Sequence, residues 1–293
     1  MFKKIFLGFI VFAVFIQVQG QGNFDDLFSQ AKKSSHRGDY QNAIAKYTKA
    51  LGINPKSVAA YNNRGIAHKH MGNFEDAIKD FTSALGVDPK HASSYYNRAN
   101  AQHHIGKNSE AIDDYSKALS YKPKDSRIYN NRGVAHRDMG HIEQAIKDFT
   151  SSLGIKPKNA VAYNNRGLAH AKKGSMEDAL KDFTSALHVD PKYGHAYYNR
   201  GVANQKLGNT EAAQQDFSSA KTQHAKNKKV RRSHYRVKSG LEKQNERYKA
   251  QDANFNKNIF NEQAQSFKAQ DANFNKNPFS QQANAYKHAD DTF

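Results

Sequence analysis

The sequence predicts an all-α solenoid, in which helix pairs stack one on the next. Near-copies of one stretch recur every 34 residues, with first positions at Val58, Ala92, Ser126, Ala160 and Gly194. In each copy the apolar residues fall at intervals of three and four, as on one face of a helix. A glycine at position fifteen divides each copy, as at the C-terminus of a helix. A fixed period of this length is typical of stacked repeats, in which each unit contacts only its neighbours.

Residues 1–22 precede the array and have the layout of a secretory signal peptide. Lys3 and Lys4 come first, followed by the apolar run from Ile5 to Ile16 and by small residues around Gly20. The run is shorter than the ~20 residues that span a bilayer. We therefore expect the segment to be removed and the mature protein to be exported, to the periplasm or the extracellular space, with no transmembrane span. An uncleaved membrane anchor remains the alternative.

Residues 23–226 hold six repeats, of which the first is the weakest match. The second copy shows the pattern: an aromatic at position four (Tyr61), a small residue at position eight (Gly65), and the apolar positions of a second helix (Ala77 and Phe81) before Pro89. The expected repeats are 24–57, 58–91, 92–125, 126–159, 160–193 and 194–227.

This period and this order of aromatic, glycine, alanine, aromatic and proline resemble the tetratricopeptide repeat (TPR). The resemblance covers residues 24–227 of 293. It implies a right-handed superhelix of helix-turn-helix units whose concave groove binds a segment of another protein. The chain departs from the family pattern with Tyr for Trp at position four, Arg for Leu at position seven, and His for Tyr at position eleven in three copies.

The resemblance also places candidate binding residues in the groove. In co-chaperone members of the family, an Asn at position six helps to clamp a peptide's terminal carboxylate. The companion basic residues do not all match here, because Arg127 at position two has no Arg at position six beside it. We expect instead a ladder of amides that holds a peptide backbone, within a polar, aromatic and basic groove. The predicted groove residues are Asn63, Asn97, Asn131, Asn165, Asn199, Tyr96, Tyr198, Lys69, Arg137, His70 and His104.

Arginine at position seven occurs only in copies that also carry aspartate at position twenty-three, whereas repeat one has Gln30 and Lys46. Antiparallel helices joined by a short turn bring these positions together, so we expect ion pairs within each repeat. A half-buried Arg is costly unless it is paired. The predicted pairs are Arg64–Asp80, Arg98–Asp114, Arg132–Asp148, Arg166–Asp182 and Arg200–Asp216.

The sequence offers no catalytic residues, and we expect no enzyme. It lacks a phosphate-cradling glycine loop, a metalloprotease helix and a serine elbow, and without cysteine it has no thiolate. The best metal candidates, His36, His70 and His104, lie on successive repeats, which are about 10 Å apart; we therefore predict no metal and no cofactor. We expect the histidines at position eleven to pack: His68, His136 and His170.

Two segments follow the array. Residues 227–248 are basic and predict a helix that caps the last repeat, with a membrane-surface helix as the alternative. Residues 249–293 repeat every 19 residues, and isolated aromatics among Asn, Gln and Lys predict a disordered tail. Because this tail carries Asp252, Asp271 and Asp290, we expect it to compete for the basic groove, by folding back or by reaching a neighbouring molecule.

The formal charge of +18 predicts acidic partners. Nucleic acid is disfavoured by the signal peptide. The favoured function is an exported scaffold that binds a peptide or helix of another protein in its groove. The alternative is a self-associating structural or assembly protein of the cell envelope that uses its aromatic tail.

Overall fold

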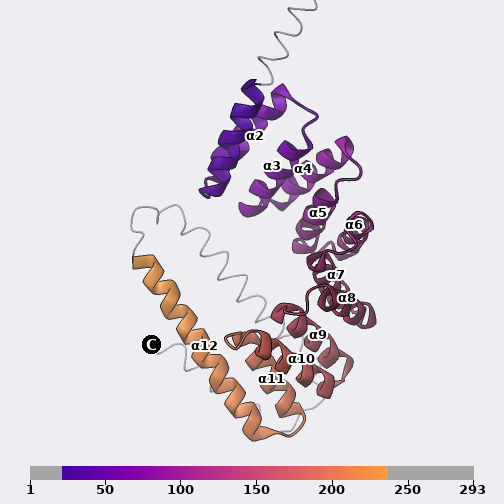
Figure 1. Cartoon of the computed structure of the whole chain (residues 1–293), viewed down its shortest axis with the longest axis vertical. Helices are drawn as coiled ribbons and strands as arrows, with labels where there is room; N and C mark the ends of the chain where they lie inside the picture. Colours follow the sequence, from indigo (N-terminus) through magenta and orange to yellow (C-terminus); the bar gives the residue numbers. More distant parts are fainter. Residues whose placement is uncertain (1–21, 237–293) are drawn as a thin grey trace, which may run out of the picture. The chain divides into compact units, whose positions relative to one another are not determined.

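The computed structural model describes residues 22–236, and every regular element in this range is a helix (Figure 1). Most of the predicted signal peptide and the predicted tail lie outside the described residues. The chain divides into two compact units, residues 1–225 and 226–293. The helical array described below belongs to the first unit.

The array consists of helix pairs in the predicted register. A first helix spans residues 22–36. The others are α2 (Tyr40–Ile53), α3 (Val58–His70), α4 (Phe74–Val87), α5 (Ala92–His104), α6 (Asn108–Tyr121), α7 (Ser126–Asp138), α8 (Ile142–Ile155), α9 (Ala160–Lys173), α10 (Met176–Val189), α11 (Gly194–Lys206) and α12 (Thr210–Arg236). From α3 onward, each odd-numbered helix opens a repeat, at the residue that the sequence period marks as position one.

Local sequence signals explain where the helices begin and end. The side chain of Ser57 accepts a hydrogen bond from the Ala60 N–H at the start of α3, which satisfies a donor that the helix itself leaves unpaired. The turn after α3 contains Gly72, whose φ of 80° favours glycine. Pro89 follows α4, and proline cannot continue a helix because it lacks the N–H.

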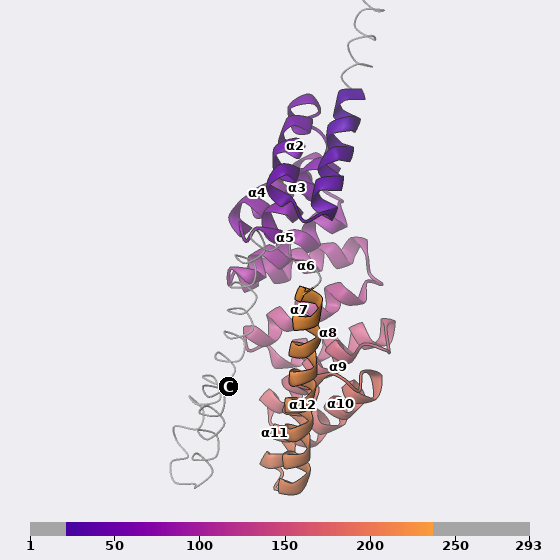
Figure 2. The same ribbon diagram turned by 90° about the vertical axis from the view of Figure 1, so that its left-hand side faces the viewer.

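The helices pack in chain order, each on the helix before it and the helix after it (Figure 2). The first helices of successive repeats also touch one another, as α3 touches α5, whereas among α2 to α11 no two second helices do. First helices therefore lie closer together than second helices, and the array curves toward them. We call the side formed by α3, α5, α7, α9 and α11 the inner face.

Small residues set the distance between the two helices of a repeat. A Cβ added to Gly65 in α3 would lie 2.7 Å from the ring of Phe81 in α4, so only glycine fits beneath this ring. Phe81 also packs with Ala77 and with Ala101 of the next repeat. The alternation of small side chains and rings thus joins the helices of one repeat to each other and to the following repeat.

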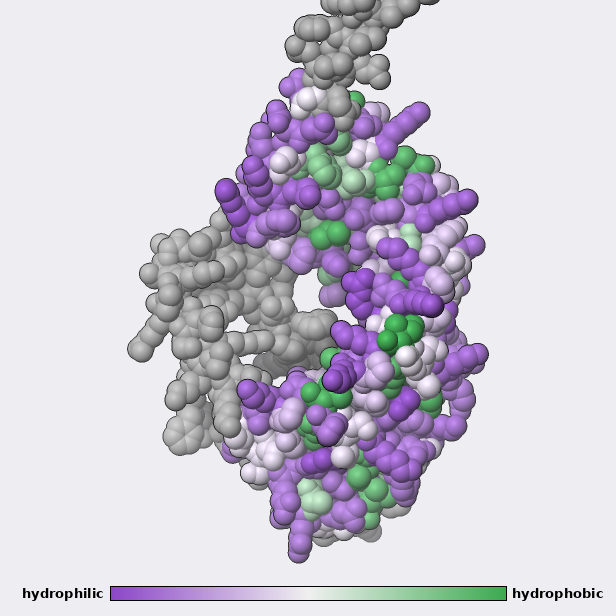
Figure 3. Space-filling model, viewed as in Figure 1, coloured by the Kyte–Doolittle hydropathy of each residue, from purple (hydrophilic) through white to green (hydrophobic). Residues whose placement is uncertain are grey.

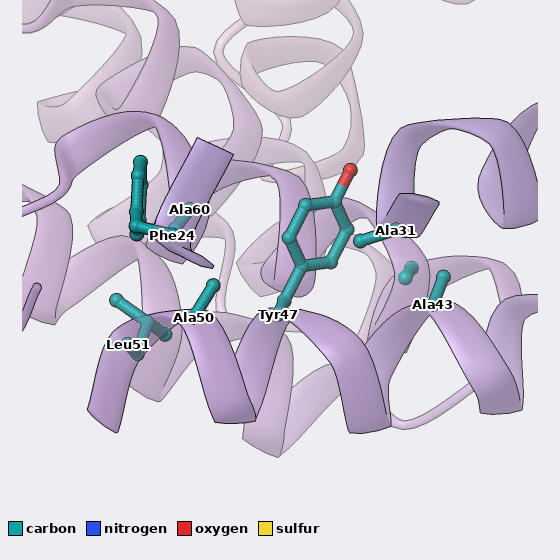
Figure 4. Packing of buried hydrophobic residues seen from close by; sticks show 8 residues of the cluster. Phe24, Ala31, Ala43, Tyr47, Ala50, Leu51 and Ala60 are labelled. Atoms are coloured by element: carbon teal, nitrogen blue, oxygen red, sulfur yellow. The ribbon is translucent and has the colours of Figure 1, made fainter. Parts of the chain in front are cut away.

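The N-terminal repeat is built with a different pair of residues. Ala31 takes the place of the glycine, and Tyr47 that of the phenylalanine. Both are fully buried, in one cluster with Phe24, Ala43, Ala50, Leu51 and Ala60 (Figure 4). The same substitution of Ala and Tyr recurs in the third repeat, as Ala99 and Tyr115. Helix 22–36 and α2 therefore form a packed repeat, although its sequence is the weakest match.

In the view of Figure 3, the surface of the described residues is mainly hydrophilic, with scattered apolar side chains. Among the described helices, none has both the length and the apolar character needed to cross a bilayer. Helix α12 runs without a break from Thr210 to Arg236. Residues 227–236 thus continue the second helix of repeat six, and the rest of the predicted capping segment lies outside the described range.

The glycine-ring contact makes a testable prediction. Gly133→Ala places a methyl group 2.8 Å from the Phe149 ring and should destabilise the protein by ~1–3 kcal/mol through overpacking. Gly154→Ala, in the paired helix α8, meets open space and should stabilise by ~0.5–1 kcal/mol. Urea unfolding followed by circular dichroism compares the two, and equal effects of both substitutions would refute the proposed role of Gly133.

Candidate functional site

The five predicted ion pairs are present, each within its own repeat. In the second repeat, Arg64 Nε donates to Asp80 Oδ2 at 2.9 Å, and its Nη2 donates to Oδ1 at 2.6 Å. The same fork joins Arg98 to Asp114, Arg132 to Asp148, Arg166 to Asp182, and Arg200 to Asp216. The aspartates are buried, and a two-pronged contact of this kind is the strongest that Arg makes with a carboxylate.

Each arginine also reaches the preceding repeat, a contact that the sequence analysis missed. Arg64 Nη1 donates to Thr48 Oγ1 at 2.9 Å, and its guanidinium lies 5.6 Å from the centroid of the Tyr61 ring. Thr82, Ser116, Thr150 and Thr184 accept the corresponding bonds in later repeats. The signal was in the sequence, because a hydroxyl residue occupies position twenty-five of every repeat that precedes an arginine.

Repeat one replaces the ion pair by a neutral acceptor and a cation. Lys46 Nζ donates to Gln30 Oε1 at 2.8 Å, across the same two positions. The contact between the two helices is therefore kept, with the donor and the acceptor exchanged between them.

The residue at position eleven faces the second side of the buried aspartate. His68, His136 and His170 place Nε2 at 3.9–4.0 Å from the carboxylate, and their buried Nδ1 atoms have no hydrogen-bond partner among the described residues. In the two other repeats that have the buried aspartate, an amide lies closer to it. Asn204 donates to Asp216 at 3.1 Å, and Gln102, with its amide nitrogen turned inward, donates to Asp114 at 3.0 Å.

The predicted asparagine ladder joins neighbouring repeats. Asn97 Nδ2 donates to Asn62 Oδ1 at 3.0 Å, and Asn165 and Asn199 make the same bond to Asn130 and Asn164. Asn131 donates to the Tyr96 hydroxyl and to Asn100. Asn63 lies beside the hydroxyl of Tyr47, whose pKa is raised by burial. Each of these amides thus makes contacts within the fold, and their binding of a peptide stays a prediction.

The histidines at position thirteen stack on aromatic rings of the preceding repeat. The His70 ring lies 4.6 Å from that of Tyr40, and the His104 ring lies 3.9 Å from that of Phe74. Both imidazoles remain exposed on their other side. Burial and the charge of Lys69 lower the pKa of His70. In the described part of the chain, no three His, Asp or Glu side chains gather as metal ligands would.

Tyr96 and Tyr198 lie on the inner face, one position before the asparagine row. Arg127 lies 5.7 Å from the Tyr96 centroid, and Tyr198 packs beside Phe217 with its ring still about half exposed at 46%. Arg137 contacts Asp138 at 3.1 Å and, through its carbonyl oxygen, accepts a hydrogen bond from Lys172. The predicted groove residues thus all lie on the first helices α3, α5, α7, α9 and α11.

Charge is divided between the two layers of helices. The five helices of the inner face contain a single acidic residue, Asp138. Their cations are Arg64, Lys69, Arg98, Arg127, Arg132, Arg137, Arg166, Lys172, Lys173, Arg200 and Lys206. The second helices α4, α6, α8 and α10 each carry acidic residues in the first turn and a buried aspartate further on. The inner face is therefore basic, and the acidic side chains lie in the other layer.

Family models for the tetratricopeptide repeat match residues 58–91, 92–125, 126–159, 160–193 and 194–222, and a TPR repeat model matches residues 36–72. The chain belongs to the TPR family. Proteins of this class bind peptides or other proteins, so the chain is a protein-binding scaffold by class. No curated protein sequence matches it.

Several solved structures are similar to this chain. The crystal structure of MamA is 29% identical, with a TM-score of 0.53, covering 55% of this chain and 95% of MamA. YrrB, described as a TPR protein with an unusual peptide-binding site, is 23% identical, with a TM-score of 0.52. The match covers 62% of this chain and 97% of YrrB. PilW, a type IV pilus biogenesis factor, is 21% identical, with a TM-score of 0.61 and coverage of 66% and 90%.

The contribution of the buried ion pairs to stability can be tested with two substitutions in the same helix, α4. Asp80→Asn removes the charge that faces Arg64 in a buried setting and should cost ~1–3 kcal/mol of unfolding free energy. Asp76→Asn, also in α4, removes the exposed partner of Lys79 and should cost less than about 1 kcal/mol. Urea unfolding of both variants measures the difference, and an Asp80→Asn loss no larger than that of Asp76→Asn would contradict a structural role for the pair.

His136, at position eleven of repeat four, makes the stability dependent on pH. Burial lowers the pKa of His136, opposed by Asp148 and aided by Arg132 and His141. The unfolded chain therefore binds the proton more readily, and stability should fall as the pH drops below about 6.5. His136→Gln copies Gln102 of the third repeat and removes this proton, so the variant should lose less stability between pH 7.5 and 5.5. An equal loss in both proteins, measured by urea unfolding, would exclude His136 as a contributor.

Proposed function

We propose that the protein is an exported scaffold that binds an acidic segment of another protein on its inner face. The observation that carries this proposal is the division of charge: the inner face has many cations and one acid, Asp138. Five of the arginines are engaged by buried aspartates, and they hold the fold together. Two further cations on this face keep donor hydrogens for a ligand: Arg127, whose exposed side chain also pairs with Asp125 at 2.7 Å, and Lys172, which donates one hydrogen bond to the Arg137 carbonyl oxygen.

The inner face also has groups that suit an extended backbone. An asparagine amide carries two donor hydrogens and one acceptor, and the bond to the preceding repeat uses one of the donors in Asn97, Asn165 and Asn199. A row of such amides, spaced by one repeat, offers hydrogen bonds to peptide groups irrespective of sequence. The cations then select for acidic side chains. The proposed function is binding without a reaction.

Export is part of this proposal, whereas self-association through the tail is the alternative function; both rest on segments outside the described residues. The signal-like segment 1–22 supports export. The tail 249–293 carries acidic residues and aromatics and is the proposed competitor for the inner face. If the tail instead joins molecules, removal of residues 249–293 will lower the number of chains per particle, which light scattering measures from the particle mass.

Binding can be measured by fluorescence anisotropy with the full chain and a labelled dodecapeptide in which glutamate alternates with leucine or serine. The same peptide with glutamine in place of glutamate is the control ligand. We expect the glutamate peptide to bind at least about tenfold more tightly at 0.15 M salt, and the difference to shrink as salt screens the charges.

Matched double variants locate the binding surface. Arg127→Gln with Lys172→Gln removes two cations from the inner face and should weaken the glutamate peptide about fivefold or more. Lys117→Gln with Lys147→Gln removes two exposed cations from second helices and should change affinity less than about twofold. Equal losses would refute the inner face as the site, and tighter retention of single-stranded RNA than of the peptide would replace this function by nucleic-acid binding.

A further inference from the structure

The turns that join one repeat to the next present an apolar side chain and a lysine at fixed positions. Position thirty, the last residue of each second helix from α2 to α10, is apolar. Four of these side chains are exposed to 38–41%: Ile53, Val87, Tyr121 and Ile155. Position thirty-three, just after the proline, is an exposed lysine in repeats one to five: Lys56, Lys90, Lys124, Lys158 and Lys192.

The turns of repeats three and four differ from the others at position thirty-one. In repeats one, two and five, a side-chain oxygen at this position accepts a hydrogen bond from the backbone N–H two residues later; the acceptors are Asn54, Asp88 and Asp190, at 3.1, 2.9 and 2.9 Å. Asn and Asp stabilise turns in this way. Repeats three and four have Lys122 and Lys156 here instead. They replace a local stabilising contact by a second cation, which the fold itself does not require.

These two turns lie on one edge of the array, because the first helices that follow them, α7 and α9, contact each other. Val161, the second residue of α9, adds an apolar side chain that is 48% exposed. We call this surface the turn patch, and it consists of Tyr121, Lys122, Lys124, Ile155, Lys156, Lys158 and Val161.

The lysines of the turn patch are not neutralised within the described part of the chain. None of the four forms an ion pair there, and Lys122 makes a single long contact, 3.4 Å from its Nζ to Ser93 Oγ. The acid of the first turn, Asp125, is paired with Arg127 at 2.7 Å. The turn patch is therefore positively charged, with apolar side chains standing among the lysines.

This chemistry suits the surface of an anionic lipid membrane. At such a surface, apolar side chains enter the boundary between headgroups and acyl chains, and lysines beside them meet the negative headgroups. Tyrosine, here Tyr121, is enriched at this depth because its ring is amphipathic. A protein interface has instead a core that is depleted of charge. Because the turn patch spans only two neighbouring repeats, a flat surface can meet it without following the curve of the array.

We propose that the turn patch of repeats three and four binds an anionic lipid surface. The lysine ammonium groups pair with headgroup phosphates, and the side chains of Tyr121, Ile155 and Val161 insert between the headgroups. The inference goes beyond the proposed function, because it concerns the turns between repeats and a lipid ligand.

Sedimentation with vesicles tests the charged half of the turn patch, using residues 23–293, the mature chain expected after export. At about 0.1 M salt, we expect at least about tenfold stronger partitioning to phosphatidylcholine vesicles that contain phosphatidylglycerol than to phosphatidylcholine alone. Lys122→Asp with Lys156→Asp gives both turns the acceptor that Asp88 supplies in repeat two, so this variant should fold, and it should lose about tenfold or more in partitioning.

A matched control makes the same change of net charge elsewhere. Lys107 precedes α6 at the end opposite to Lys122, and Lys147 is exposed in the middle of α8. Lys107→Asp with Lys147→Asp should change partitioning about twofold or less, because both sites are separated from the turn patch by about a screening length or more.

The apolar half of the turn patch has a control at the same positions of other repeats. Tyr121→Ser with Ile155→Ser should weaken vesicle binding about fivefold or more, because the inserted apolar area is lost. Ile53→Ser with Val87→Ser changes the equivalent residues of repeats one and two, whose turns lack the second lysine, and should have about a twofold effect or less.

Every other outcome overturns the inference. It fails if the wild-type chain does not prefer the phosphatidylglycerol vesicles, or if either variant of the turn patch loses no more binding than its control. Single-stranded RNA that is retained without any vesicle binding, and released by the aspartate variant, would assign the turn patch to nucleic acid. Circular dichroism checks that each variant is folded. If the aspartate variant is not, Lys124→Gln with Lys158→Gln removes two lysines of the same patch and takes its place, with Lys107→Gln and Lys147→Gln as its control.

Discussion

The buried aspartate in the second helices of repeats two to six is the constraint on which this structure depends. A carboxylate in a poorly hydrated setting must be paired, and in five repeats a forked arginine from the first helix of the same repeat does this. The arginine also binds the hydroxyl at position twenty-five of the repeat before it. One guanidinium therefore fixes the two helices of a repeat and their register on the preceding repeat.

This pairing also shapes the surface. Because the acid comes from one layer and the base from the other, the first helices are basic and the second helices acidic from repeat two to repeat five. The position-seven arginines are neutralised internally by the buried aspartates. The charge arrangement that stabilises the solenoid thus also gives it a basic inner face, which suits an acidic partner by electrostatic complementarity.

Much of the fold follows from the sequence, because a solenoid is specified by contacts between neighbours. The period gave the first residue of each first helix, from Val58 to Gly194, and the co-occurrence of Arg and Asp gave the ion pairs within each repeat. The expectation that histidines at position thirteen line a groove did not include their contacts with aromatic rings. Their stacking on Tyr40 and Phe74 depends on the aromatic that begins the second helix of the preceding repeat, a contact that no single repeat reveals. The hydrogen bonds from the asparagines at position six to position five of the preceding repeat also join two repeats, so the sequence of one repeat does not reveal them.

Hydrogen-deuterium exchange of the full chain, with and without saturating glutamate peptide, tests the central claim most directly. A ligand held on the inner face should slow amide exchange in α3, α5 and α7 and leave α4, α6 and α8 little changed. Protection confined to the second helices, or none at a concentration where anisotropy shows saturation, would contradict the assignment of the inner face as the binding surface.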